Sequence, residues 1–243
     1  MKHIRYIKHF AQILTVLTIV TTFPACDFES EGVYVDDTFE PAQLLDYYVD
    51  EYGNEGIVAY SMNSSSSEYQ IVMSADETYL PWGPMGEQVY DADTMKGTNL
   101  GSHEYGVAML QTMKSRGIER YPAQAWCNHK NHSEKYPQGG SWHLPTYHEL
   151  VIIFGNGGAN VKKINAALQS IGGTPLTSDA LYWSCTEDYD GYAKINNVTS
   201  DYNSQDRAVV STPSRTTTST KERWLKKNSH YVRAIKYIYY EDL

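Results

Sequence analysis

The sequence predicts an α+β fold, with strands near both ends of the chain and helices between them. β-rich runs occur between residues 56 and 73, helical periodicity extends from about residue 104 to residue 172, and β-rich runs return after residue 181. Clusters of strands and of helices that are separated along the chain are typical of α+β domains.

The first expected element is a β-hairpin. Its strands are Gly56–Tyr60 and Gln70–Met73, and the serine-rich segment Asn63–Ser67 lies between them as a polar loop. Gly83 and Pro84 then mark a turn.

Two helices are expected after this turn. The first begins near Glu104 and ends at Gly117. Its apolar face consists of Val107, Leu110 and Met113. The second begins at Pro122, because proline is favoured at the first position of a helix, and includes Trp126 and Cys127.

The third and fourth helices have the clearest boundaries. Thr146 and Glu149 form a capping box at the start of the third, and Gly155 ends it. The fourth has an apolar stripe of Val161, Ile164, Leu168 and Ile171 and ends at Gly172. Five residues are expected in the core: Trp142, Leu144, Leu150, Leu168 and Trp183.

Three strands are expected after the helices: Leu181–Cys185, Arg207–Val210 and Tyr231–Ile235. The polar segments 186–206 and 211–230 lie between them. Loops of such length are uncommon inside a compact domain and tend to be functional.

The N-terminal segment has the parts of a bacterial lipoprotein signal. Three basic residues precede a short apolar run, and Ala25 stands directly before Cys26. We expect cleavage before Cys26 and lipid attachment to it. Residues 1–25 are then the signal peptide, 26–42 an acidic tether and 43–243 the folded domain.

The acidic tract Asp27–Glu31 directly follows the predicted lipidation site. It resembles the surface-export signal of Bacteroidota-type lipoproteins, and it also has the composition of a solvated, disordered tether. We therefore expect a lipid-anchored outer-membrane protein that faces the cell exterior. The net charge of −9 argues against nucleic acid as a partner and against membrane contact other than through the lipid.

A series of short motifs resembles a known family. The motifs are Trp142-His143-Leu144-Pro145-Thr146, Ile164-Asn165-Ala166-Ala167-Leu168, Tyr182-Trp183-Ser184-Cys185 and Tyr231-Val232-Arg233, in that order. They resemble the Fibrobacter succinogenes-type major paralogous domain family, which is similar to the C-terminal domain of the Legionella collagen-like adhesin. The likeness spans roughly residues 47–238.

This resemblance implies a C-type-lectin-like fold of the formylglycine-generating-enzyme type, with helices beside a twisted antiparallel sheet and long irregular loops. Family members are mostly surface or secreted proteins of adhesive or unknown role. Gly139-Gly140-Ser141-Trp142 also occurs in formylglycine-generating enzymes, but the reactive cysteine pair of those enzymes has no counterpart here. We therefore expect no enzymatic activity and no cofactor.

Two further sets of residues could carry chemistry. Cys127 and Cys185 could form one disulfide or remain as two buried thiols, and the sequence does not decide between them. Cys127, His129, His132, His143 and His148 cluster in sequence but lack the paired spacing of a zinc site. We expect no metal.

Aromatic and amide side chains in the late loops are the expected ligand-binding residues, because rings supply contact area and polar groups fix orientation. They are Asp188, Tyr189, Tyr192, Asn196, Tyr202, Asn203 and Trp224. The basic residues Lys221, Arg223, Lys226 and Lys227 surround Trp224 as a possible acidic-glycan patch or a solvated face. The expected function is a surface module that binds a glycan or a surface or host protein. The alternatives are an accessory subunit of a surface complex and, less favoured, an enzyme of the formylglycine-generating type.

Overall fold

The computed structural model describes residues 43–64, 67–90, 103–131, 141–187, 207–214 and 222–239. Within these ranges the chain forms two β-sheets and four α-helices, which confirms the α+β class. The expected signal peptide, the lipidation site Cys26 and the acidic tether lie outside the described residues. In the described part, no helix is both long and apolar enough to cross a membrane.

The first sheet has four antiparallel strands in the order β1-β2-β3-β9. The strands are β1 (Tyr47–Val49), β2 (Glu55–Ser64), β3 (Ser67–Ser74) and β9 (Ile235–Tyr239). β2 and β3 confirm the expected hairpin. They extend farther into the serine-rich segment than expected, because Ser64 and Ser67 still pair across the hairpin.

The second sheet has five strands in the order β4-β8-β5-β6-β7. The strands are β4 (Thr78–Pro81), β5 (Tyr182–Glu187), β6 (Arg207–Ser211), β7 (Glu222–Leu225) and β8 (Ser229–Val232). β5 pairs with β8 in parallel, and the other pairs are antiparallel. β7 and the start of β8 lie in segment 211–230, so the expectation of one long loop there was wrong.

The expected strand Tyr231–Ile235 is in fact two strands in different sheets, β8 and β9. The chain changes sheets at the buried Arg233, whose guanidinium is held by distant parts of the chain. It donates hydrogen bonds to the carbonyl oxygens of Ser74 (2.9 Å) and Thr174 (2.8 Å) and forms an ion pair with Glu77. These contacts fix the crossover between the two sheets.

The helices are α1 (His103–Ser115), α2 (Pro122–His129), α3 (Tyr147–Phe154) and α4 (Val161–Ser170), with 3-10 turns η1 (Ile118–Arg120) and η2 (Asn156–Gly158). Each of the four expected α-helices is present. The capping box of Thr146 and Glu149 forms at α3, and Gly155 ends that helix with φ +74°. On α1 the buried face differs from the expected one, since Val107 is only half-buried while Tyr105 and Met109 are fully buried.

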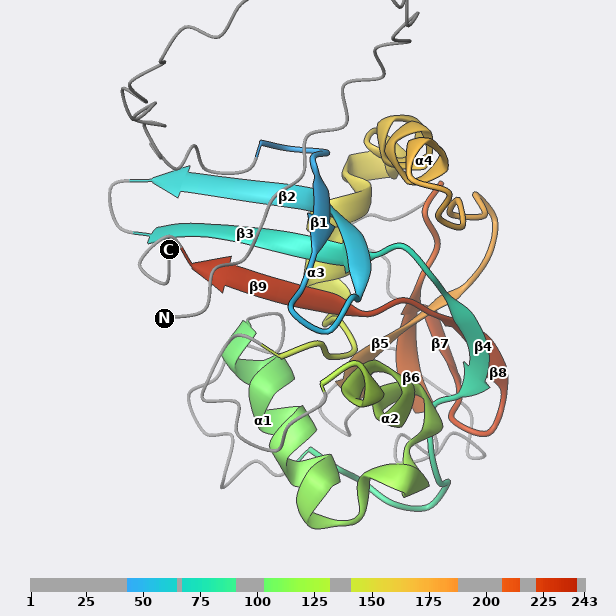
Figure 1. Cartoon of the computed structure of the whole chain (residues 1–243). Helices are drawn as coiled ribbons and strands as arrows, with labels where there is room; N and C mark the ends of the chain where they lie inside the picture. Colours follow the sequence, from blue (N-terminus) through green and yellow to red (C-terminus); the bar gives the residue numbers. More distant parts are fainter. Residues whose placement is uncertain are drawn as a thin grey trace, which may run out of the picture.

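The core has two main parts, one on each face of the four-stranded sheet. Val58 and Val72 face the cluster that includes residues of α1 and α2, whereas Ile57 and Ile71 face the cluster of α3 and α4. Figure 1 shows β2, β3 and β9 side by side, with α1 and α2 below them. All five expected core residues are buried: Trp142, Leu144, Leu150, Leu168 and Trp183.

Candidate functional site

The expected ligand-binding residues fall mostly outside the described part of the chain. This applies to Asp188, Tyr189, Tyr192, Asn196, Tyr202 and Asn203. Trp224 is described and lies on β7, at one edge of the five-stranded sheet, with 39 % of its surface exposed. Its ring packs edge-on against His230 at 5.1 Å between centroids, so one side of the indole is fixed and another faces solvent.

The basic residues near Trp224 do not form one surface patch. Lys226 is completely buried, where its ammonium forms an ion pair with Glu187 and donates to the carbonyl oxygen of Glu87 at 2.7 Å. Its Nζ also lies 4.7 Å from the centroid of the Trp82 ring. Lys227 is exposed, and Lys221 lies outside the described residues. Lys226 therefore has a structural role rather than a ligand-binding one.

Cys127 and Cys185 are both buried and unpaired, so the disulfide between them is not formed in this structure. Both thiols belong to the cluster that packs against α1 and α2. Burial raises the pKa of each thiol, which keeps them protonated near neutral pH. The alternative of two buried free thiols is the one that the structure shows.

The histidines that cluster in the sequence are dispersed in the structure. His129 is exposed beside Glu119, with 3.0 Å between Nε2 and Oε1, and His148 is exposed on α3. His132 lies outside the described residues. Of the clustered histidines that the structure describes, His143 alone is buried, and its backbone pairs with Ile235 at the start of β9.

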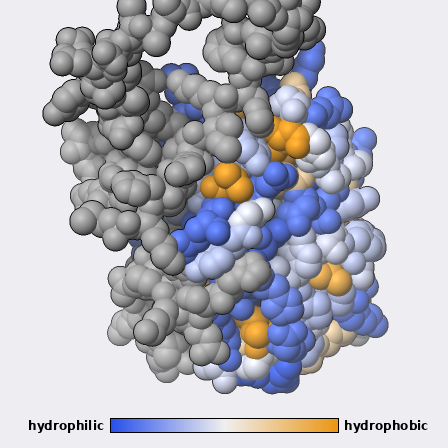
Figure 2. Space-filling view, in the orientation of Figure 1, coloured by the Kyte–Doolittle hydropathy of each residue, from blue (hydrophilic) through white to orange (hydrophobic). Residues whose placement is uncertain are grey.

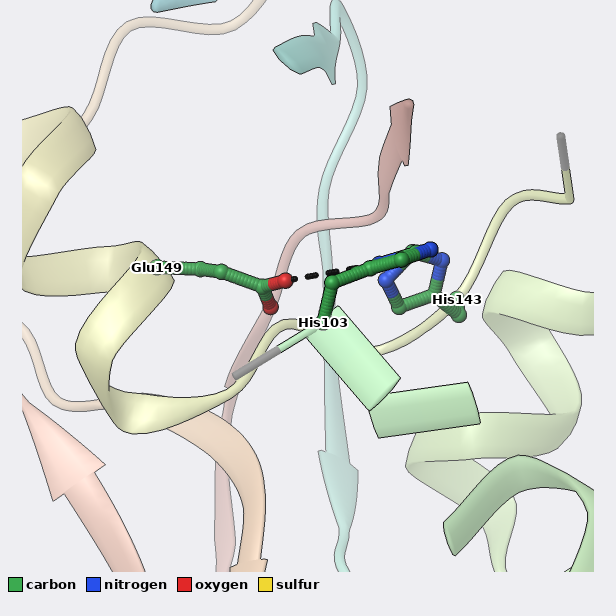
Figure 3. A group of neighbouring side chains, drawn as sticks. All are labelled: His103, His143 and Glu149. Atoms are coloured by element: carbon green, nitrogen blue, oxygen red, sulfur yellow. Dashed lines mark ion pairs between the residues drawn. The ribbon is translucent and has the colours of Figure 1, made fainter. Parts of the chain in front are cut away.

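His143 instead meets two residues that the sequence had not linked to it. His103, at the first position of α1, and Glu149, in the first turn of α3, converge on it (Figure 3). One ligand-type atom from each of the three residues lies within 4.8 Å of the others. The start of α1 thus meets the start of α3 and the segment just before it, and together they bring two imidazoles and one carboxylate close to one another.

The carboxylate of Glu149 is buried and anchored by two neutral donors. The backbone N–H of Thr146 donates to Oε2 at 2.6 Å, and the hydroxyl of Tyr237 donates to Oε1 at 2.8 Å. Burial alone would raise the pKa of Glu149, but the neighbouring His103 and the hydrogen bonds from Thr146 and Tyr237 outweigh it and hold the pKa below its ordinary value. Glu149 is therefore an anion inside the protein.

The ring of His143 is held in one orientation. Its Nδ1 lies 2.7 Å from the carbonyl oxygen of Ser141, and since a carbonyl can only accept, Nδ1 must carry the proton. Burial lowers the pKa of His143, so the ring is neutral and Nε2 presents a free lone pair. Within the described residues, Nε2 has no hydrogen-bond partner.

His103 lies between this pair and a group of tyrosines. Its ring centroid is 3.8 Å from that of Tyr237, and its Nδ1 is 3.7 Å from Oε1 of Glu149. Tyr237 continues into a row of rings on the same face of the sheet, with Tyr69 at 5.1 Å and Tyr239 at 6.1 Å. Neither nitrogen of His103 has a hydrogen-bond partner among the described residues.

Sequence reasoning missed this group for identifiable reasons. Glu149 was correctly assigned to the capping box, and that local role gave no sign of a second one. His103 stands just before the first expected helix and 40 residues before His143, without a metal-binding spacing. The one available signal was that His143 falls between two predicted core residues, Trp142 and Leu144.

Exposed apolar side chains are the other features of the described surface that could contact a partner. The face in Figure 2 is mainly hydrophilic, and its hydrophobic residues form separate patches. The exposed large apolar residues include Tyr79 on β4, which is 58 % exposed and lies at the edge of the five-stranded sheet opposite to that of Trp224.

Comparison with known proteins gives one informative likeness. No protein-family model matches the chain, and no curated protein matches it significantly. A solved structure of a fimbrial protein from Bacteroides ovatus ATCC 8483 is similar, with a TM-score of 0.56 and 14 % sequence identity. The match covers 80 % of this chain and 48 % of that protein, so this chain spans about half of its length. At this identity the likeness concerns the fold.

Proposed function

We propose that this chain is a non-enzymatic protein displayed on the cell surface, anchored by lipid on Cys26, and that it binds a glycan or another surface or host protein. The main support is the fold shared with a fimbrial protein of Bacteroides ovatus. The secretory signal and the acidic tract behind Cys26 support it independently. Fold alone does not determine function, so the binding surface needs its own argument.

Trp224 supports the location of the binding surface. A partly exposed indole that is fixed on one side offers rigid contact area with little loss of conformational freedom on binding. The expected ligand residues between 188 and 203 precede β6, which pairs with β7 beside Trp224. The proposed C-type-lectin-like architecture would present these loops together.

The buried thiols support a non-enzymatic role. A formylglycine-generating type of chemistry needs a reactive thiolate, and reactive cysteines lie in accessible, electropositive surroundings. Cys127 and Cys185 are buried with raised pKa values.

The anchor can be tested by Cys26→Ala, with Ser30→Ala in the expected tether as the control. Membrane and soluble fractions are compared, and protease digestion of intact cells measures surface display. We expect the Cys26→Ala protein to leave the membrane fraction and the Ser30→Ala protein to remain. A Cys26→Ala protein that stays fully membrane-bound contradicts the lipid anchor.

The binding surface can be tested by alanine replacement of Tyr189, Tyr192, Asn196, Tyr202, Asn203 and Trp224 together. A glycan array and a pull-down with surface and matrix proteins identify a ligand for the wild-type protein. We expect the protein with all six replacements, the six-residue variant, to lose binding, because a few aromatic contacts usually dominate an interface. Its melting temperature should change little, because side chains that contact a ligand from the surface usually contribute little to stability.

The matched control is Tyr79→Ala, which removes an exposed ring at the opposite edge of the same sheet. It should retain binding. A folded six-residue variant that still binds the ligand would place the site elsewhere.

A second candidate function is an accessory subunit of a surface assembly, which the fimbrial neighbour specifically favours. Crosslinking on intact cells followed by mass spectrometry tests it. A specific partner subunit that is also captured by the six-residue variant would support the accessory role over ligand binding through the loops.

A further inference from the structure

We propose that His103, His143 and Glu149 form a binding site for a divalent transition-metal ion of the Zn²⁺ class. The ligands are Nε2 of His143, a ring nitrogen of His103 and a carboxylate oxygen of Glu149 (Figure 3). This inference does not depend on the proposed surface role. It also departs from the expectation of no metal that the sequence alone gave.

The chemical nature of the donors favours this class of ion. Two imidazoles with one carboxylate are a known zinc ligand set, in which three protein groups leave a fourth position for water or another ligand. Calcium and magnesium prefer sites built from oxygen atoms alone, so two nitrogen ligands disfavour them.

Charge balance gives a second argument. The carboxylate of Glu149 is buried, and among the described residues it forms no ion pair with a lysine or arginine. The only cationic partner there would be His103, at 3.7 Å and only if that ring were protonated. Buried charges are normally paired or bound to metals, because an isolated charge is costly in a low-dielectric interior. A divalent cation would neutralise this carboxylate.

The groups behind the ligands have the arrangement of a metal site. Metal-binding histidines usually donate their second N–H to a carbonyl or carboxylate, and binding carboxylates are themselves hydrogen-bonded. Nδ1 of His143 donates to the carbonyl oxygen of Ser141. The carboxylate of Glu149 accepts from the hydroxyl of Tyr237 and the backbone N–H of Thr146. The unpartnered Nε2 of His143, in a residue with only 2 % exposed surface, is thereby aimed into the cluster.

Zinc binding requires the three ligand atoms to move closer together. Zinc bonds of about 2.0–2.1 Å place two ligands of a tetrahedral site about 3.3 Å apart. The three atoms here lie within 4.8 Å, so the widest pair must approach by about 1.5 Å or less. His103 can supply this movement, because it is the first residue of α1 and its nitrogens make no hydrogen bonds with the described residues.

The test uses protein expressed from the full 243-residue sequence without a histidine tag and stripped with a chelator. Zn²⁺ is titrated by calorimetry, and bound metal is measured after equilibrium dialysis. We expect one saturable Zn²⁺ site per chain. At free zinc 100 times above Kd, the melting temperature should rise by about 5–10 °C.

His143→Gln should lower zinc affinity by more than about 100-fold, because it removes a ligand and not merely a supporting group. Tyr237→Phe removes only the hydrogen bond to Glu149 and should lower affinity by about 10–100-fold. The matched control is a double variant, His129→Ala with His148→Ala, which removes two exposed imidazoles. It should bind zinc like the wild type.

Folding of each variant is checked by circular dichroism. If His143→Gln does not fold, His103→Gln serves in its place, because His103 is partly exposed and lies at a helix end. The proposal is overturned if the wild type binds no saturable zinc. It is equally overturned if a folded His143→Gln or His103→Gln variant binds zinc like the wild type.

Discussion

Replacing Lys226 by methionine should destabilise the protein strongly, because it leaves a carboxylate buried without its cation. Lys226 and Glu187 are both fully buried and form an ion pair. Glu187 also accepts from the backbone N–H groups of Val89 (2.8 Å) and Tyr90 (2.7 Å), which fixes its carboxylate in place. Methionine is similar in length to lysine, so the change removes the charge and the donor with little change in volume.

The magnitude follows from the burial of both partners. Removing one member of a buried ion pair typically costs about 3–5 kcal/mol, because the remaining charge is uncompensated. Removing both charges costs less, so Lys226→Met combined with Glu187→Gln should be more stable than Lys226→Met alone. For a domain of this size, about 2–4 °C per kcal/mol corresponds to a fall in melting temperature of about 6–20 °C.

Urea denaturation followed by tryptophan fluorescence measures the free energy of unfolding for each variant. The neighbouring Lys227→Met is the matched control, because Lys227 is exposed and its loss should change stability by less than about 0.5 kcal/mol. Equal stabilities for the Lys226→Met and Lys227→Met proteins would refute the buried ion pair.

Three further predictions concern the core, a helix cap and pH. Leu168→Ala should cost about 2–5 kcal/mol in urea denaturation, because Leu168 is fully buried; a change near zero would contradict its burial. Thr146→Ala should cost about 0.5–2 kcal/mol in the same assay by removing the helix cap of α3, and no loss would argue against the cap. Burial tends to raise the pKa of Asp50, but hydrogen bonds from Trp142 and Asn54 outweigh it and hold the pKa below its ordinary value. The resulting stabilisation is complete above the unfolded pKa of about 4 and is lost as the pH falls through the folded pKa. Thermal melts should therefore show a smaller loss of stability between about pH 5 and pH 2 for Asp50→Asn than for the wild type, and equal losses would contradict the lowered pKa.

The helices could be predicted from the sequence because their boundaries depend on neighbouring residues. The capping box of Thr146 and Glu149, the proline at the start of α2 and Gly155 after α3 act within a few positions of themselves. The β2–β3 hairpin was likewise predictable, since its two strands are adjacent in the sequence.

The strand pairing after residue 181 depended on distant residues. The break between β8 and β9 occurs at Arg233, whose partners lie near residues 74–77 and at 174. A continuous β-rich run gives no sign of such a crossover. Lys226 was misjudged for a similar reason, because its burial follows from contacts with Glu87 and Glu187 rather than from its basic neighbours.

The candidate metal site could not be predicted because no local pattern encodes it. His143 and Glu149 lie six residues apart around the start of α3, but His103 comes from the start of α1 and meets them only after α1 has packed beside α3. Whether Cys127 and Cys185 form a disulfide was also a question of distance and orientation in space, which the positions of two cysteines in a sequence do not reveal.

The positions of β8 and β9 have a consequence for the order in which the chain can fold. β9 completes the sheet that begins with β1, and β8 lies between β4 and β5, so both sheets need residues 229–239. Pairing over such long separations is slow because a large loop must close before the contacts form. A chain that emerges N-terminus first therefore cannot complete either sheet until its C-terminal segment has also emerged.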